Sequence, residues 1–120
     1  MATLPSPRQW PCRGAEKTIY IGGQNAVSAD GQIVGDTLAA QTEQVYRNLE
    51  TVLAAAGATP HDIIKWTISM VQGHDFAPAF AVFQRWWGAA ANPPAISVIV
   101  VAGLAHPDFL VEIEAIAVTA

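Results

Sequence analysis

Residues Phe109 to Val118 have the sequence FLVEIEAIAV, in which side chains alternate with the two-residue period of a β-strand. One face would carry Val111, Ile113 and Ala115, and the other Leu110, Glu112, Glu114 and Ile116. The first face is purely apolar, which predicts a strand lying on a hydrophobic core. The second face combines apolar residues with two carboxylates, which are costly to bury without partners. The apolar face of this strand therefore indicates which side of the sheet is covered. The two carboxylates on the other face are candidates for a catalytic or binding role.

Two helices are predicted upstream of this strand. Apolar residues from Leu38 to Ala56 recur at steps of three and four, and Gly57 stands where a glycine commonly ends a helix. A second helix is expected between Asp75, which can cap its start, and Gly88. Its expected buried stripe consists of Phe76, Ala79, Phe80, Phe83 and Trp87.

Three further strands are predicted from β-branched and aromatic content, at Thr18 to Gly23, Ile63 to Val71 and Ile96 to Ala102. Alternation in the second of these predicts one apolar face formed by Ile64, Trp66, Ile68 and Met70. The third is apolar on both faces, as expected of a strand covered on both sides. Asp30-Gly31 indicates a hairpin turn after the first strand.

This order predicts one α+β domain over residues 1–120, a mixed sheet with both helices on one face. The opposite face has no cover within the chain. Only 13% of the residues are charged, against about 25% in a typical domain. We therefore expect copies of the chain to close over that face as a homo-oligomer. The alternative is a monomer with an unusually apolar surface.

Charge and hydropathy argue against nucleic acid and membrane as partners. The net charge of −4 lacks the basic footprint that phosphate binding needs. The longest apolar run, Pro94 to Ala105, is far shorter than the roughly 20 residues of a membrane-spanning helix. Residues Met1 to Ala15 lack the apolar core of a signal peptide, so we expect a cytoplasmic protein.

Standard metal, nucleotide and thiol signatures are missing from the sequence. It contains no glycine-rich phosphate loop, and His61, His74 and His106 lack metal-ligand spacing, so we expect no metal and no cofactor. Cys12 is the one cysteine, which excludes a disulfide within the chain, and no base for it is identifiable.

The carboxylates of Glu112 and Glu114 allow two interpretations. A carboxylate on an apolar face can exchange a proton or hold a water molecule, which is general acid or base chemistry. Alternatively, both carboxylates face solvent or pair with basic residues at a subunit interface. Spacing alone does not separate these interpretations.

A series of short motifs resembles the Rid family of reactive intermediate deaminases, also called YjgF-like proteins. The motifs are Ile21 to Gln24, Asp30-Gly31, Gln41-Thr42, Asn48-Leu49, Leu53, Ala56-Gly57, Asp62 to Lys65, Asp75-Phe76, Pro93 to Ala95, and Leu110 to Ala117. Each motif is weak alone, but together they occur in the family's order and spacing.

The resemblance implies a chorismate-mutase-like α+β fold and a homotrimer with a central barrel and three ligand clefts between subunits. Members of the family hydrolyse enamines and imines such as 2-aminoacrylate to a keto acid and ammonia, without metal or cofactor. Glu112 matches the glutamate that positions or activates water, and Gly23 matches a glycine whose backbone lines the cleft. The backbone of Val98 takes the place of a frequent cysteine.

The sequence departs from the family pattern where the substrate is held. Ile96 replaces the arginine that grips the substrate carboxylate, and an alkyl group cannot imitate a guanidinium fork. Phe80 stands where deaminating members often have asparagine, and Gly22 replaces a serine. Trp10 lies in the region of the family's cleft tyrosine. Each departure makes the expected cleft more apolar.

We therefore expect a hydrolytic deaminase of reactive enamines or imines, or a related water-adding enzyme, whose small-molecule substrate is not 2-aminoacrylate. The alternative is a non-catalytic trimeric protein that binds a small molecule in the same clefts. A ribonuclease activity, once attributed to relatives, is disfavoured by the acidic balance and the lack of a histidine pair. The sequence assigns no role to Cys12, His106 or Glu114.

Overall fold

The structure is a computed structural model that describes residues 16–87 and 93–120. Its elements in chain order are β1 (Lys17–Gln24), α1 (Leu38–Ala55), the short 3-10 helix η2 (Pro60–Asp62), β2 (Ile63–Val71), α2 (Ala77–Trp87), β3 (Ala95–Val101) and β4 (Val111–Thr119). The predicted strands and helices are all present, with ends within a few residues of those expected. Trp10 and Cys12 lie outside the described residues.

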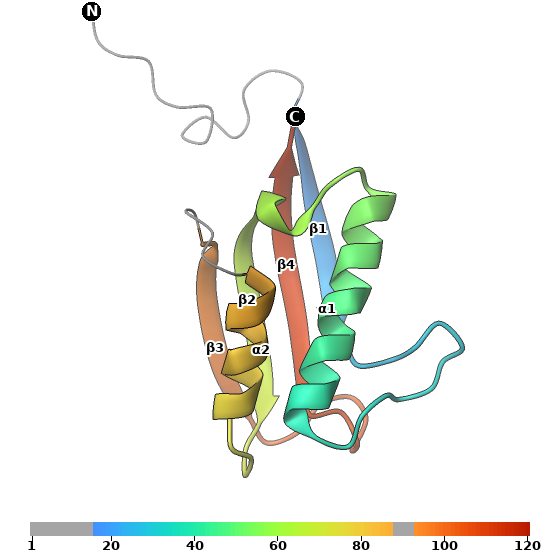
Figure 1. Cartoon of the computed structure of the whole chain (residues 1–120), viewed down its shortest axis with the longest axis vertical. Helices are drawn as coiled ribbons and strands as arrows, with labels where there is room; N and C mark the ends of the chain where they lie inside the picture. The colour runs from blue at the N-terminus through green and yellow to red at the C-terminus, as the bar shows by residue number, and fades with distance from the viewer. Residues whose placement is uncertain (1–15, 88–92) are drawn as a thin grey trace, which may run out of the picture.

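The strands form one mixed sheet in the order β1-β4-β2-β3. β4 is antiparallel to both of its neighbours, whereas β2 and β3 are parallel and are joined through α2. Both helices cover the same face of the sheet, as Figure 1 shows. The predicted α+β class, with two helices on one face of a mixed sheet, is confirmed.

Local signals explain where the helices begin and end. The Thr37 hydroxyl accepts a hydrogen bond from the Ala40 N–H (3.1 Å) at the start of α1. Gly57 follows the helix with φ of +77°, a conformation that glycine adopts without strain. At the start of α2, the Asp75 carboxylate accepts from the Ala77 N–H at 3.0 Å, as predicted. In the described residues, neither helix is long and apolar enough to cross a membrane.

Side chains of β4 alternate between the two faces of the sheet as predicted. Val111, Ile113, Ala115 and Ala117 are buried beneath the helices. Glu112 is half-buried and Glu114 exposed, both on the opposite face, which is called the open face below. The open face has no covering element among residues 16–87 and 93–120.

An aromatic cluster joins α1, α2 and β2 on the covered face. The Tyr46 ring stacks on Trp86 with a centroid separation of 4.4 Å and meets Phe83 edge-on at 4.9 Å. Trp66, which is 1% exposed, lies 5.3 Å from Tyr46. Burial raises the pKa of the Tyr46 hydroxyl far above its usual range. This cluster packs the helices firmly on the sheet.

The prediction that Ile64 belongs to the apolar face of β2 was wrong. Ile64 is 43% exposed, and its neighbour Ile63 is buried instead. The reason is a register shift between β2 and β4, because Ile63 pairs with Ala117 and Lys65 with Ile116. An irregularity of this kind interrupts the two-residue period.

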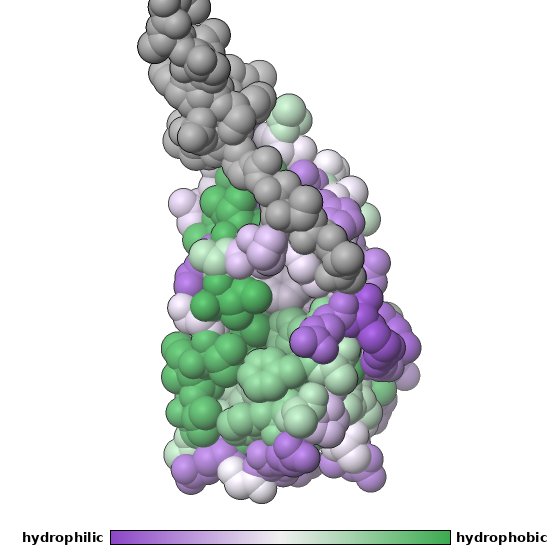
Figure 2. Space-filling view, turned by 60° about the vertical axis from the view of Figure 1, so that its left-hand side comes forward, coloured by the Kyte–Doolittle hydropathy of each residue, from purple (hydrophilic) through white to green (hydrophobic). Residues whose placement is uncertain are grey.

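Two predictions around α2 and β3 also need correction. Phe80 was expected in the buried stripe of α2, but it is 40% exposed and Val82 is buried in its place. β3 was expected to be covered on both sides, but it forms the edge of the sheet, and Ile96, Val98, Ile99 and Val100 are all exposed. Figure 2 shows apolar side chains gathered on this side of the molecule.

Candidate functional site

A β-bulge at Gly22-Gly23 shapes the first part of the site. Ile21 of β1 pairs with Ala115 of β4, and Gln24 pairs with Ile113. Between these pairs β1 has one residue more than β4, so the glycines bend the strand locally. Bulges occur frequently next to active sites because they redirect neighbouring groups.

The bulge brings Gly23 against the side chain of Glu112. A Cβ atom added at Gly23 would lie 2.6 Å from Cδ and 2.7 Å from Oε1 of Glu112, whereas a Cβ at Gly22 would meet nothing within 4 Å. Neither glycine is among those with a positive φ. Glycine at position 23 therefore leaves space for the carboxyl group, which any side chain there would displace, and backbone conformation does not explain its presence.

Glu112 projects from the middle of β4 on the open face, directly opposite Ser69 of β2. It takes part in neither of the two ion pairs found among the described residues, which both involve Glu43. Its carboxylate is therefore half-buried against the Gly23 backbone and not neutralised by a described cation. Such a group can hold and polarise a water molecule.

Ile96 and Val98 lie on the other side of the sheet from Glu112. In β3 they stand opposite Trp66 and Ile68 of β2, which are core residues on the covered face. Phe80 is carried by α2 on that same side. Within one chain the structure thus brings Gly23 and Glu112 together and separates them from Ile96, Val98 and Phe80.

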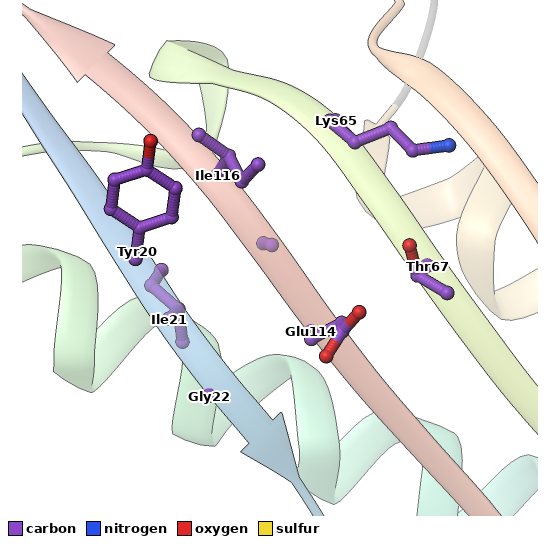
Figure 3. A pocket seen from close by; sticks show the side chains of 8 residues that line it. Tyr20, Ile21, Gly22, Lys65, Thr67, Glu114 and Ile116 are labelled. Carbon is purple, nitrogen blue, oxygen red and sulfur yellow. The ribbon is translucent and has the colours of Figure 1, made fainter.

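A shallow hollow of about 260 Å³ lies on the open face beside the bulge. It is lined by Tyr20, Ile21, Gly22, Lys65, Thr67, Glu114, Ala115 and Ile116 (Figure 3). The Lys65 ammonium donates to the Ser97 hydroxyl at 2.6 Å and extends away from Glu114. Sequence reasoning missed Lys65 and Tyr20 here, although their positions in alternating strands could have placed them on this face.

The described residues contain no cluster of histidine, cysteine and acidic side chains that could hold a metal ion. The ring of His106 has a local role, since its Nδ1 accepts a hydrogen bond from the Asp108 N–H at 3.0 Å.

Comparison with known proteins shows which family the chain belongs to. Residues 12–119 match the family model described as Endoribonuclease L-PSP, the YjgF/Rid family. The chain belongs to the Rid family. A solved Rid family protein of unknown function from Yersinia pestis, YyfB, shares 41% identity with a TM-score of 0.74, covering 84% of this chain and 77% of that one. The resemblance inferred from the sequence motifs is thereby confirmed.

Other Rid family relatives have names that state an activity. The 2-iminobutanoate/2-iminopropanoate deaminase of Rattus norvegicus is 32% identical over 104 residues, or 86% of this chain and 74% of that protein. The solved yeast protein Mmf1 matches with a TM-score of 0.78 and 26% identity, covering 86% of this chain and 80% of that one. At the level of the family, imine deaminase activity is supported.

The contact between Gly23 and Glu112 predicts different results for the two glycines of the bulge. In Gly23→Ala, the carboxyl group of Glu112 must retreat by about 1 Å to restore an ordinary carbon–carbon distance of about 3.5–4.0 Å. In the matched control Gly22→Ala, the new methyl group enters open space and Glu112 keeps its place. Crystal structures of both variants measure this; an unmoved Glu112 in Gly23→Ala would contradict the steric argument.

Proposed function

We propose that the protein is a hydrolytic deaminase of reactive imines and their enamine tautomers, with Glu112 as the catalytic residue. The observation that carries this proposal is the carboxylate of Glu112 lying beside Gly23, where an added Cβ atom would come within 2.6–2.7 Å of it. The deaminase names of its relatives support the same chemistry. The proposed site requires no metal and no cofactor.

The reaction needs one water molecule and one group that moves protons. An enamine first takes a proton on carbon and loses one from nitrogen to become the imine. The Glu112 carboxylate then accepts a proton from water as its oxygen bonds to the imine carbon. Returning that proton to nitrogen gives a carbinolamine. Glu112 then moves the proton of the new hydroxyl group to nitrogen, so that ammonia leaves as the carbon–nitrogen bond breaks and the carbonyl group forms. Water and imine are thereby converted to ketone and ammonia with Glu112 regenerated.

We further propose that the site is completed by a neighbouring copy of the chain in a homotrimer. Glu112 lies on the open face, whereas Ile96, Val98 and Phe80 lie on the covered side near the free edge of the sheet. Because these groups cannot converge within one chain, a second copy must bring its edge to the open face of the first. The exposed apolar residues of β3 and the uncovered sheet face supply the surfaces for this contact.

The proposed substrate is larger or less anionic than 2-aminoacrylate. Where the family resemblance expects an arginine, this chain has Ile96, which is 50% exposed and cannot form charge-assisted hydrogen bonds to a carboxylate. Loss of such a desolvated pair costs about 2–5 kcal/mol, or about thirtyfold to several-thousandfold in rate. Exposed Phe80 and Val98 extend an apolar wall along the same side.

That apolar wall also favours a second candidate function, a binding protein that holds an apolar or aromatic small molecule without turnover. Phe80, Ile96 and Val98 provide contact area and no group that moves a proton. The same trimeric clefts serve both candidates, so the role of Glu112 decides between them. Imines can be generated in situ by amino-acid oxidases and screened by following ammonia release. A substrate found in this way allows the deaminase and the binding protein to be distinguished.

Replacement of Glu112 by glutamine tests the proposed catalytic role. In a deaminase, Glu112→Gln should lower kcat about 10²- to 10⁴-fold, because the amide keeps the volume but cannot take a proton. The melting temperature should remain nearly unchanged. Glu114→Gln is the matched control, since it makes the same change two residues along β4 at an exposed position. Full activity in Glu112→Gln would assign the chemistry to another group, and a wild type without turnover would favour the binding protein.

Introducing an arginine at position 96 tests the proposed substrate preference. Ile96→Arg should raise kcat/KM for 2-aminoacrylate by about tenfold, equivalent to about 1.4 kcal/mol of transition-state binding. Phe80 and Gly22 also differ from the family pattern, so full recovery is not expected. Thr51→Arg is the control, because it adds the same charge at an exposed position of α1, away from the proposed contact. A wild-type protein that already deaminates 2-aminoacrylate efficiently would refute the preference.

The proposed assembly has a simple physical test. Light scattering at micromolar concentration should return three times the chain mass of 12.7 kDa. A monomer under these conditions would remove the cleft between subunits, because Glu112 and Ile96 would then stay on opposite faces of one sheet.

A further inference from the structure

Two amide side chains interrupt the apolar face that α1 turns toward the sheet. Gln41 and Asn48 are seven residues apart, which places them on the same side of the helix two turns from each other. Val45 and Leu49, on the same side, are fully buried. Gln41 is only 1% exposed, although burying an amide is unfavourable unless its hydrogen bonds are made.

Gln41 uses its amide to hold the chain that enters β4. Its Nε2 donates to the carbonyl oxygens of Gly35 (3.0 Å) and Asp108 (2.8 Å). Its Oε1 accepts from the N–H of Leu110 at 2.9 Å. Leu110 comes two residues before Glu112, so this side chain fixes the backbone immediately ahead of the proposed catalytic residue.

Asn48 holds the chain that leaves β1. Its Nδ2 donates to the carbonyl oxygens of Asn25 and Val27, both at 2.9 Å. The side chain of Asn25 in turn donates to the carbonyl oxygen of Val111 at 3.2 Å. Asn25 comes two residues after Gly23, and Val111 directly precedes Glu112. This chain of hydrogen bonds therefore connects α1 to both strands of the site.

The place of the Glu112 carboxylate beside Gly23 depends on how β1 and β4 lie relative to each other. Atoms of the Glu112 side chain lie 2.6–3.0 Å from the position that a Cβ atom of residue 23 would take. A shift of a few tenths of an ångström between β1 and β4 changes how the carboxylate lies on the glycine backbone. Hydrogen bonds from one rigid helix to both strands restrict that shift.

We propose that Gln41 and Asn48, the latter through Asn25, are positioning residues that set the Glu112 carboxylate on Gly23. None of the three needs to touch the substrate, since they act through the backbone on each side of the site. The kinetic part of this inference rests on the proposed deaminase function. Its structural part, the placement of Glu112, stands independently of any activity.

Three variants test the proposal. Asn25→Ala removes the hydrogen bond to Val111, Asn48→Ala removes the two bonds from α1 to the end of β1, and Gln41→Met removes the bonds to the start of β4 while keeping the side-chain length. A purely structural role would lower stability alone. The control is therefore Leu53→Val, a core substitution near the far end of α1, compared at similar loss of melting temperature.

The first readout is the NMR resonance of the Glu112 carboxyl carbon in protein labelled with ¹³C-glutamate, assigned by its absence in Glu112→Gln. We expect this resonance to move toward that of a solvent-exposed glutamate in the three variants and to stay in place in Leu53→Val. The second readout is kinetic. With the substrate found by the imine screen, kcat should fall by about tenfold to a hundredfold with KM within about twofold, as expected of misplaced catalytic groups.

The two readouts separate failure of this inference from failure of the proposed function. A shifted resonance in a protein whose wild type has no turnover would support the positioning role and reject the deaminase. An unshifted resonance with unchanged kcat in the variants would overturn the positioning role. If Asn48→Ala or Gln41→Met does not fold, Asn25→Ala alone tests the positioning role. This variant is expected to fold because it removes only one hydrogen bond, at a half-buried position.

Discussion

The central position of β4, between two antiparallel neighbours, is the constraint on which the rest of the structure depends. Both edges of β4 are paired, with β1 on one side and β2 on the other. Its alternating side chains must therefore divide strictly between the helix-covered core and the open face. A shift of one residue would bury two carboxylates and expose Val111, Ile113 and Ala115. The apolar face of β4 thus fixes where Glu112 points.

Much of the fold could be predicted because each signal is local or strictly periodic. The alternation in β4, the apolar stripe of α1 and the glycine at position 57 require no knowledge of distant contacts. The predictions of burial were wrong where burial depends on contacts with distant parts of the chain. A register shift exchanged Ile63 with Ile64, and α2 is so rich in apolar residues that its pattern could not choose between Phe80 and Val82. In β3, composition alone could not distinguish a central strand from an edge strand.

The candidate site was only partly accessible from the sequence. Motif resemblance selected Gly23 and Glu112, but the spacing of 89 positions between them gives no hint of contact; the bulge in β1 and the pairing of β1 with β4 create it. The two adjacent glycines could not be ranked until the space around each was known. The roles of Gln41 and Asn48 were likewise hidden, since their partners are backbone groups of two distant loops.

The free edge of β3 has a consequence for the solubility of a single chain. Along that edge, backbone N–H and C=O groups find no strand partner within residues 16–87 and 93–120, and the side chains beside them are apolar. Edges of this kind recruit other strands without discrimination and promote aggregation unless they are covered. The proposed assembly would therefore place a newly made chain in kinetic competition between orderly association and precipitation. Under that proposal, its solubility would depend on how fast copies meet, and so on the chain's concentration and rate of synthesis.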